Sequence, residues 1–590
     1  MLKRLLKWTG IAFGLFMAWF SWQLWWPAGP IRVSPETTFI TAPLADDGLP
    51  NYSEYVLDQM REGVTPANNG AIPFIQAMWP AGLWGDDEKH LVCDELGMEV
   101  PSEAGLDSPY SNRQLMTELY EWCGGDPEPA GESADDELDG IGFTGQERDN
   151  NLSPDEALLD AVEEGPWTAT DAEPIARWLA EHAPHFDLLY AAVEREKFYF
   201  PSPTLLADPK ACFVRVMIPG EQRIRSAASC LKLRANLRLG SGDIRGAWDD
   251  CRVMYQLTDV STHPTVLCEV ISHNIEKFAN ALLLRILESP ELTPELAEEI
   301  DAFLATRQPQ HNMRDTLETG NRIDHITSLL EISDFRPLEE SNTPDWVVPR
   351  DRDNGREPSI DWTTVLHIAN QQYDLFLEAV DQPTYAEQQA ALDAWYAEIQ
   401  RKAVQPSPVS FMLSCKVRTE YMAYMLLEGY GDNFALRLDR QNRTHRQLPQ
   451  TAVALARYQL ATGEYPESLD GLMPQFLDKL PIDPFDRPIV YQRTSDGYLL
   501  YSLGPNCIDD RGNCIELRTL QGYPIPDDEA AEMQLRKKLG EPALDVEVDN
   551  FHNDDVLVID TTIDPELQTD DIAIRLPLLQ RPIPKFERVE

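Results

Sequence analysis

Apolar residues recur every three to four positions along much of the chain, which is the spacing of an amphipathic α-helix. Ile175, Trp178 and Leu179, for example, fall on one helical face. The chain is therefore expected to be mainly α, with an α-helical array over residues 166–440. Outside the sharpest unit, described next, the spacing predicts helices at 52–61, 70–78, 264–288, 295–307, 314–332, 363–399 and 406–430.

The sharpest helical unit is residues 231–255, LKLRANLRLGSGDIRGAWDDCRVMY. One helix is predicted to end at Gly240, and Asp243 is placed to cap a second helix that continues through Ala247 and Trp248. Two helices joined by a Gly-Asp turn, with a small residue at their crossing, are typical of a tetratricopeptide-like hairpin. No fixed period links this unit to others, so we expect an irregular array rather than a regular solenoid.

The pattern changes after the array, in residues 451–510. Apolar positions predict a helix up to Gly463, which suits a left-handed C-terminal cap, and Pro466 prevents the helix from continuing. β-Branched and aromatic runs at 489–493 and 498–503 flank a turn that ends in Asp-Gly, a strong hairpin signal. These features predict a small α+β module over residues 441–518.

Three stretches of this module, ATGEYPESLDGL, DPFDRP and YLLYSLGP, resemble the soluble part of type II secretion major pseudopilins. The resemblance implies a pseudopilin-like α+β fold for this part of the chain only. Pseudopilins also carry a processing Gly, followed by Phe and then by Glu four residues further on, before their hydrophobic helix. This chain has none of that pattern, so we do not expect it to assemble as a pilus subunit.

The loop GPNCIDDRGN, residues 504–513, offers oxygen ligands from the side chains of Asn506, Asp509, Asp510 and Asn513. Calcium prefers a shell of hard oxygen ligands, and major pseudopilins have a calcium site in the corresponding loop. The resemblance therefore implies a calcium site here. A metal-free acidic turn and a loop braced by a disulfide are the alternatives.

The chain contains nine cysteines. Cys507 and Cys514 bracket the short acidic loop and form the first candidate disulfide of an exported chain. Cys93 and Cys123 are a second candidate pair. Buried free thiols are expected at the positions in apolar helical context, namely Cys212, Cys230, Cys251, Cys268 and Cys415.

Residues 8–26 carry no charge, are rich in Phe, Leu and Trp, and follow Lys3, Arg4 and Lys7. A helix of this length spans about 28 Å, close to the ~30 Å hydrocarbon core of a bilayer. We therefore expect residues 1–27 to form a transmembrane anchor in the cell inner membrane, with the bulk of the chain periplasmic. A cleaved signal peptide is the alternative, although the stretch WWPAGP lacks a small-x-small cleavage site.

The length of 590 residues suggests about three to four domains. The formal net charge of −49 argues against a nucleic-acid partner, because phosphate binding requires clustered Lys and Arg. The predicted organisation is an anchor at 1–27, an exported segment at 28–165 with an acidic flexible insertion at 124–151, the array at 166–440, the module at 441–518, and an acidic tail at 519–590. In that tail, 530–539 is an expected helix, and 556–560 and 572–576 are candidate edge strands.

A second resemblance spans more of the chain. The tryptophan-rich N-terminal segment, the LRLGSGDIRGAWDD hairpin, the module and the stretch IAIRLP together resemble a group of long membrane-anchored proteins of planctomycete-type bacteria. This resemblance implies the same architecture but brings no established activity with it.

Candidate catalytic chemistry is sparse. Ser229 and Lys232 match an S-x-x-K pattern, but no S-x-N or K-T-G element follows in order. His182 and His185 are three positions apart without an H-E-x-x-H motif, which favours a capping or surface role over metal binding. No catalytic or cofactor-binding residue is assigned. We expect a membrane-anchored extracytoplasmic binding or scaffold protein that contacts envelope or secretion-system proteins; the alternative is an exported hydrolase with an unrecognised active site.

Overall fold

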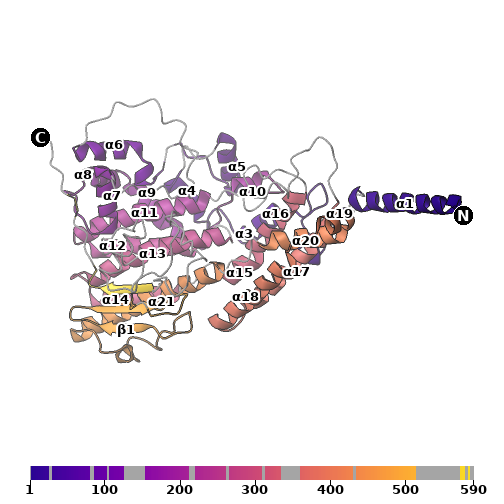
Figure 1. The fold of residues 1–590 in the computed structure, drawn as a ribbon. Helices are drawn as coiled ribbons and strands as arrows, with labels where there is room; N and C mark the ends of the chain where they lie inside the picture. Colours follow the sequence, from indigo (N-terminus) through magenta and orange to yellow (C-terminus); the bar gives the residue numbers. More distant parts are fainter. Residues whose placement is uncertain are drawn as a thin grey trace.

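The computed structural model describes residues 2–25, 29–79, 85–102, 105–124, 153–211, 219–260, 265–307, 313–333, 359–428, 434–509, 511–512, 572–578 and 583–584. Helices dominate these residues, and one small sheet packs beside them (Figure 1). The prediction of a mainly α protein is confirmed. The acidic insertion expected at 124–151 lies outside the described residues apart from Gly124.

A first group of short helices, drawn in purple shades at the top of Figure 1, follows the N-terminal helix. Helices predicted at 52–61 and 70–78 are present as α3 and α4. The helix α7 was not predicted, although the sequence contains a signal for its start: Ser153 and Glu156 form a capping box. The group comprises α2 (Pro35–Thr38), α3 (Tyr52–Met60), α4 (Ala71–Ala77), α5 (Asp86–Leu96), the 3-10 turn η1 (Pro109–Ser111), α6 (Arg113–Trp122), α7 (Pro154–Glu164), α8 (Glu173–Glu181), α9 (Ala183–Val193) and α10 (Pro203–Ala207).

The predicted helical hairpin is confirmed at the centre of the body. Its first helix ends at Gly240, and the Asp243 carboxylate accepts a hydrogen bond from the Gly246 amide at 2.9 Å to start the second. Gly240 also lies so close to Trp167 that a Cβ atom would stand 1.9 Å from the carbonyl oxygen of that tryptophan. This central group consists of α11 (Pro219–Gly240), α12 (Ile244–Asp259), α13 (Val266–Glu288) and α14 (Pro294–Thr306).

The next group of helices departs from the sequence pattern in two places. The pattern over 363–399 divides into two helices, because Thr384, directly after Pro383, starts a new helix by accepting the Glu387 amide at 3.3 Å. The prediction of a single helix over 406–430 is wrong. The backbone of Ser414 is extended, with φ −136° and ψ 110°, and divides the stretch into two helices. The group comprises α15 (Met313–Thr316), the π-helical turn η3 (Leu317–Asn321), α16 (Arg322–Ser333), α17 (Trp362–Val380), α18 (Tyr385–Lys402), α19 (Pro408–Leu413) and α20 (Cys415–Glu428).

The predicted hairpin and one of the two candidate edge strands are confirmed. They form an antiparallel sheet in the order β1-β2-β3, in which Arg493 pairs with Tyr498 and Tyr498 with Leu576. The expected helix at 530–539 and strand at 556–560 lie outside the described residues. The elements of this part are α21 (Phe434–Thr462), the 3-10 turn η5 (Leu469–Leu472), β1 (Val490–Arg493), β2 (Tyr498–Ser502) and β3 (Ile572–Leu576).

The long helix α21 joins the sheet to the helical array. It passes residue 440 without a break, ends before Gly463 at φ 87° as predicted, and packs against α13 and α14 as well as β2 and β3. Its buried Ala452 and Val453 belong to the same apolar core as Ile275 of α13 and Leu500 of β2. The module and the array therefore share one core.

The helix α1 (Leu2–Trp25) extends away from the body and contacts α19 at its inner end (Figure 1). Its apolar side chains are largely exposed, including Trp8 at 69%, Phe13 at 66% and Leu15 at 68%. None of the helices in the described residues combines the length and the mean hydropathy needed to cross a membrane.

Candidate functional site

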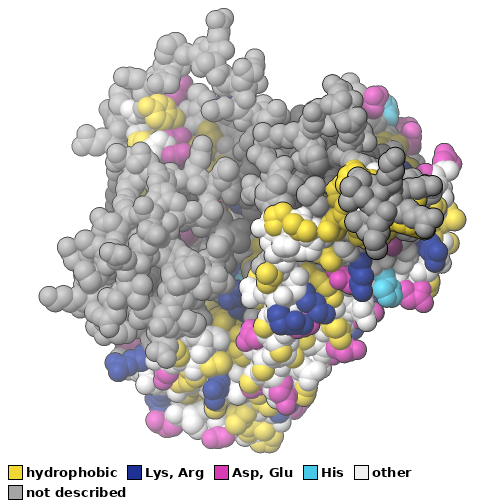
Figure 2. All heavy atoms as spheres, turned by 45° about the vertical axis from the view of Figure 1, so that its right-hand side comes forward, with side chains coloured by type: hydrophobic (Ala, Val, Ile, Leu, Met, Phe, Trp, Pro, Cys, Tyr) yellow, Lys and Arg dark blue, Asp and Glu magenta, His cyan; other side chains and the backbone are white. Residues whose placement is uncertain are grey.

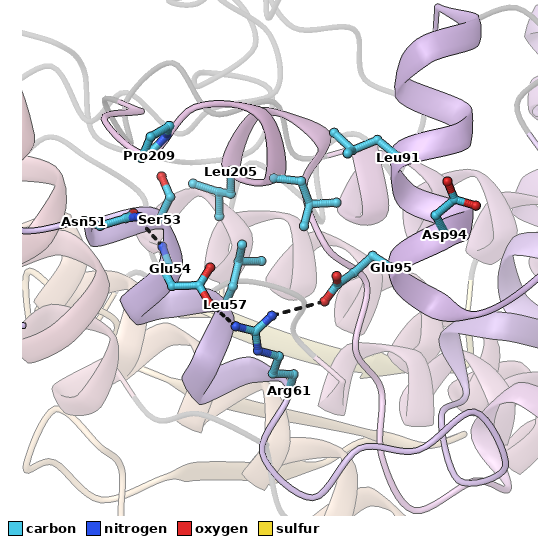
Figure 3. A pocket seen from close by; sticks show the side chains of 11 residues that line it. Asn51, Ser53, Glu54, Leu57, Arg61, Leu91, Asp94, Glu95, Leu205 and Pro209 are labelled. Carbon is cyan, nitrogen blue, oxygen red and sulfur yellow. Dashed lines mark hydrogen bonds and ion pairs between the residues drawn. The ribbon is translucent and has the colours of Figure 1, made fainter. Parts of the chain in front are cut away.

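A pocket of about 510 Å³ opens between α3, α5 and the segment that contains α10 (Figure 3). Hydrogen bonding at the start of α3 shapes one wall, since the Asn51 side chain accepts the Glu54 amide at 2.9 Å and turns Glu54 towards the pocket. Apolar side chains form much of the remaining lining. The pocket thus combines an apolar wall with acidic side chains, namely Leu57, Leu91, Leu205 and Leu206 with Glu54, Asp94 and Glu95.

Arg61 organises the polar side of this pocket. Its guanidinium pairs with Glu54, donates to Asp58 at 2.9 Å and approaches Glu95 at 3.4 Å, which ties α3 to α5. The Tyr199 hydroxyl donates to the same Glu95 oxygen at 3.0 Å. Hydrogen bonding to Asp58 raises the pKa of Arg61, while burial and then Glu95 raise the pKa of the Tyr199 hydroxyl. Both groups therefore keep their protons at neutral pH.

The charges of the lining bear on which ligand this pocket can hold. The lining contains three carboxylates and one guanidinium, so the local potential favours a positively charged ligand group over an anion. The hydroxyl of Ser53 donates to the Asp208 carbonyl at 2.7 Å and is thus held by the backbone instead of by a base.

A second hollow, an open groove of about 520 Å³, follows α21 and the loop before β1. Its lining contains four cations, Arg440, Arg443, Arg446 and Lys479, and two carboxylates, Asp483 and Asp486, so positive charge is in excess there on a chain of strongly negative net charge. On the described part of the face in Figure 2, by comparison, acidic and basic side chains are interspersed. This groove therefore differs in charge from the pocket beside α3.

The buried Arg440 shows how the groove is built. It is 6% exposed, and its guanidinium donates to the Pro484 carbonyl and the Gln388 side-chain oxygen, both neutral acceptors. The neighbouring carboxylate of Asp483 is held by the Phe485 amide at 3.0 Å and by the Ser502 hydroxyl at 2.7 Å. The loop is thereby fixed against α21, α18 and β2.

The predicted calcium ligands lie only partly within the described residues. The Asn506 side-chain oxygen accepts the Ile508 amide at 2.7 Å, and an Asp509 oxygen accepts the Tyr501 hydroxyl at 2.9 Å and the Arg511 amide at 2.8 Å. These contacts form a hydrogen-bonded turn and do not decide between calcium and a metal-free loop. Asp510 and Asn513 lie outside the described residues, so the calcium site stays a prediction.

Some of the cysteine predictions can be tested within the described residues, and others cannot. Cys93 and Cys123, the second candidate pair, are buried free thiols, so that disulfide is wrong. Cys93 lies in α5 and Cys123 caps the end of α6, and both are buried in the same apolar core. The Cys507–Cys514 pair stays a prediction, because Cys514 lies outside the described residues. Free buried thiols are confirmed at Cys230, Cys251 and Cys268. Cys415 is only half-buried, contrary to the expectation, and Cys212 lies outside the described residues.

The side chains of the S-x-x-K pattern point to separate partners. The Ser229 hydroxyl donates to Glu163 at 2.7 Å, while the Lys232 ammonium lies 4.7 Å from the centre of the Phe278 ring. His182 makes a 2.8 Å hydrogen bond to the Trp178 carbonyl and packs on that indole, which agrees with the capping role expected for it. Among the described residues no cluster of three His, Cys, Asp or Glu side chains has the geometry of a metal site.

Neither hollow was predicted, although each leaves a trace in the sequence. Glu54, Asp58 and Arg61 are spaced along one face of α3, as expected for ion pairs on a helix. Arg440, Arg443 and Arg446 recur every three positions, which places them along one side of α21. The pattern alone does not identify which distant segment completes each hollow.

In comparisons with known proteins, no family model, no curated protein and no solved structure matches the chain.

Proposed function

We propose that this chain is a membrane-anchored, extracytoplasmic binding or scaffold protein of the cell envelope. The observation that carries the proposal is the exposed apolar surface of α1. Phe13, Leu15 and Phe16 are 66%, 68% and 47% exposed, and successive residues of a helix are about 100° apart. They therefore cover more than one face of the helix. Surroundings that are apolar on all sides, as in lipid, suit such a helix better than a single protein groove.

The length and ends of α1 support the same proposal. Its 24 residues span about 36 Å at 1.5 Å per residue, so α1 has the length to cross the ~30 Å hydrocarbon core, whereas its mean hydropathy lies below that of a typical membrane-crossing helix. Lys3, Arg4 and Lys7 precede the apolar run, and Trp22 and Trp25 end it. Basic residues favour the cytoplasmic side and tryptophans favour an interface, so the body would lie on the periplasmic side of the inner membrane.

A binding role follows from the body itself. Its helices present an extended surface that carries an acidic pocket beside α3 and a basic groove beside α21. Contact with secretion or pilus-like machinery is proposed from the pseudopilin resemblance of residues 451–510. Neither hollow brings a nucleophile next to a base in its described lining, so no observation favours the exported hydrolase.

Alkaline extraction of membranes tests the anchor. The full chain should stay in the membrane pellet, whereas a variant with Phe13, Leu15 and Phe16 changed to Gln should be released. A matched variant with Val64 changed to Gln, on the body, should stay with the pellet. Release of the native chain would overturn the anchor.

Cross-linking in native membranes, followed by purification of the tagged chain, tests the binding role. Envelope or secretion-system proteins should copurify. A version with Arg443→Glu and Lys479→Glu tests whether the basic groove holds them. Recovery of the native chain alone would overturn the scaffold role and make activity screening for a hydrolase the next experiment.

A further inference from the structure

The chain that follows α1 is fixed to the body within a short distance. The Arg32 amide donates to the Thr363 hydroxyl at 3.2 Å, and the Asn370 side chain donates to the Pro35 carbonyl at 2.7 Å. Six residues, 26–31, separate Trp25, the last residue of α1, from Arg32, so seven residue steps join the two. Such a segment spans at most about 25 Å when fully extended. The first turn of α17 must therefore lie close to the place where α1 leaves a membrane.

A second set of contacts places α19 and α20 at the same end of the body. The Asp361 amide donates to the Thr419 hydroxyl at 3.0 Å, and the Arg418 guanidinium donates to the Ser359 carbonyl at 3.2 Å. The helix α19 itself contacts α1, and in Figure 1 it lies at the end of α1 that is nearest the body. Residues 401–416, which run from the end of α18 through α19 to the start of α20, are called the proximal segment below.

The proximal segment has the chemistry of a surface that contacts lipid. Val404 and Val409 are 69% and 65% exposed, and no Asp or Glu occurs from 401 to 416. The segment carries three basic residues, Arg401, Lys402 and Lys416, so its formal charge is positive on a chain with 99 acidic and 50 basic residues. The side chains of Arg401 and Lys416 are 68% and 80% exposed.

These cations have only exposed partners. Arg401 pairs with Glu398 at 2.7 Å and Lys416 with Glu420 at 3.5 Å. Ion pairs between such exposed groups contribute little stability in water, about 0–1 kcal/mol each. Both cations can therefore turn to a phosphate without disturbing the fold.

We propose that the proximal segment rests on the lipid headgroups beside α1, with Val404 and Val409 in the interface and Arg401 and Lys416 on lipid phosphates. Exposed apolar side chains between basic residues are typical of segments that lie on a membrane surface. The inference rests on the proposed membrane anchor. The body would then contact the membrane at two places, through α1 and through the proximal segment. Two contacts fix the orientation of the body, whereas α1 alone would not.

Lipid quenching of a fluorophore tests the inference in the full chain. An environment-sensitive amino acid replaces Val409 in one sample and Ile482, 72% exposed in the loop before β1, in a matched control. In vesicles with nitroxide-labelled lipids, quenching at 409 should exceed quenching at 482 by about twofold or more, as expected for an interfacial position. Arg401→Glu combined with Lys416→Glu should reduce quenching at 409, and more so on anionic than on zwitterionic vesicles.

The outcomes separate the two proposals. If the chain floats with the vesicles but position 409 is quenched no more than 482, the proximal segment does not touch lipid and the inference is overturned, while the anchor stands. If the chain does not float with the vesicles, both fail. Circular dichroism of each variant verifies that the helices are intact.

Discussion

Arg307 and Glu276 form an ion pair inside the helical array, with 2.9 Å between Nη1 and Oε1. The same guanidinium meets Asp259 at 2.8 Å, and Arg446 approaches Glu276 at 3.3 Å. The side chains of Arg307 and Glu276 are 8% and 5% exposed. Burial alone would raise the pKa of the Glu276 carboxyl, but Arg307 and Arg446 together outweigh it, so the pKa is lowered. This network connects the end of α14 with α12, α13 and α21.

Removing Arg307 should therefore strongly destabilise the fold. Arg307→Leu leaves Asp259 and Glu276 as buried charges without their main partner, and we expect a loss of about 3–5 kcal/mol in the free energy of unfolding. Arg245→Leu, which removes an exposed pair with Glu299, should change it by about 1 kcal/mol or less. Urea denaturation compares the two. Equal losses would show that the buried network does not stabilise the array.

The buried Glu163 predicts how the stability of the fold depends on pH. Burial raises the pKa of its carboxyl above the ordinary 4.5, although Lys232 and the hydrogen bond from Ser229 oppose the shift. A raised pKa means that the stabilising effect of the protonated group is complete below the unfolded pKa and is lost as pH rises through the folded value. The free energy of unfolding of the native chain should thus fall relative to Glu163→Gln as pH increases. Gln keeps the acceptor for Ser229 but does not titrate.

Urea midpoints of both proteins, measured at about pH 5 and about pH 8, provide the comparison. Glu62→Gln, an exposed site on the same chain, serves as the control. A difference between the native chain and Glu163→Gln that does not change with pH would contradict the assignment.

The cap of the central hairpin is a third test. Asp243→Ala leaves the Gly246 amide without its acceptor and should lower stability by about 0.5–2 kcal/mol. Asp243→Asn retains the acceptor oxygen and should lose clearly less. Thermal unfolding of both variants distinguishes a capping role from a purely electrostatic one, for which Asn would be as harmful as Ala.

Local signals explain what could be predicted. Asp243, Gly463 and the Asp-Gly turn at 496–497 act on the few residues next to them, so their helix ends and hairpin are legible in the sequence. Contacts between residues that are distant in the chain cannot be predicted in this way. Nothing near Arg307 in sequence indicates Glu276, and nothing near Arg61 indicates Glu95. The Cys93–Cys123 prediction failed for the same reason, because spacing does not tell whether two helices turn their thiols towards each other.

Calcium provides a fourth test, directed at the loop 504–513. If Asn506, Asp509, Asp510 and Asn513 bind calcium, the ion should stabilise the full chain by about 2.7 kcal/mol at a hundredfold excess over its Kd. Asp509→Asn should remove most of the thermal shift, whereas Asp496→Asn, in the exposed hairpin turn, should leave it unchanged. No shift with calcium in the native chain would establish the metal-free turn instead.

Protease access to intact cells stripped of their outer membrane tests the central claim most directly. The chain carries an epitope tag before Met1, and protease is added from outside, with and without detergent. The account predicts that the body is digested while the tag and α1 remain as a small protected fragment, which detergent then exposes. Digestion of the tag together with the body, or protection of the whole chain, would contradict an anchor that crosses the membrane with the body on the periplasmic side.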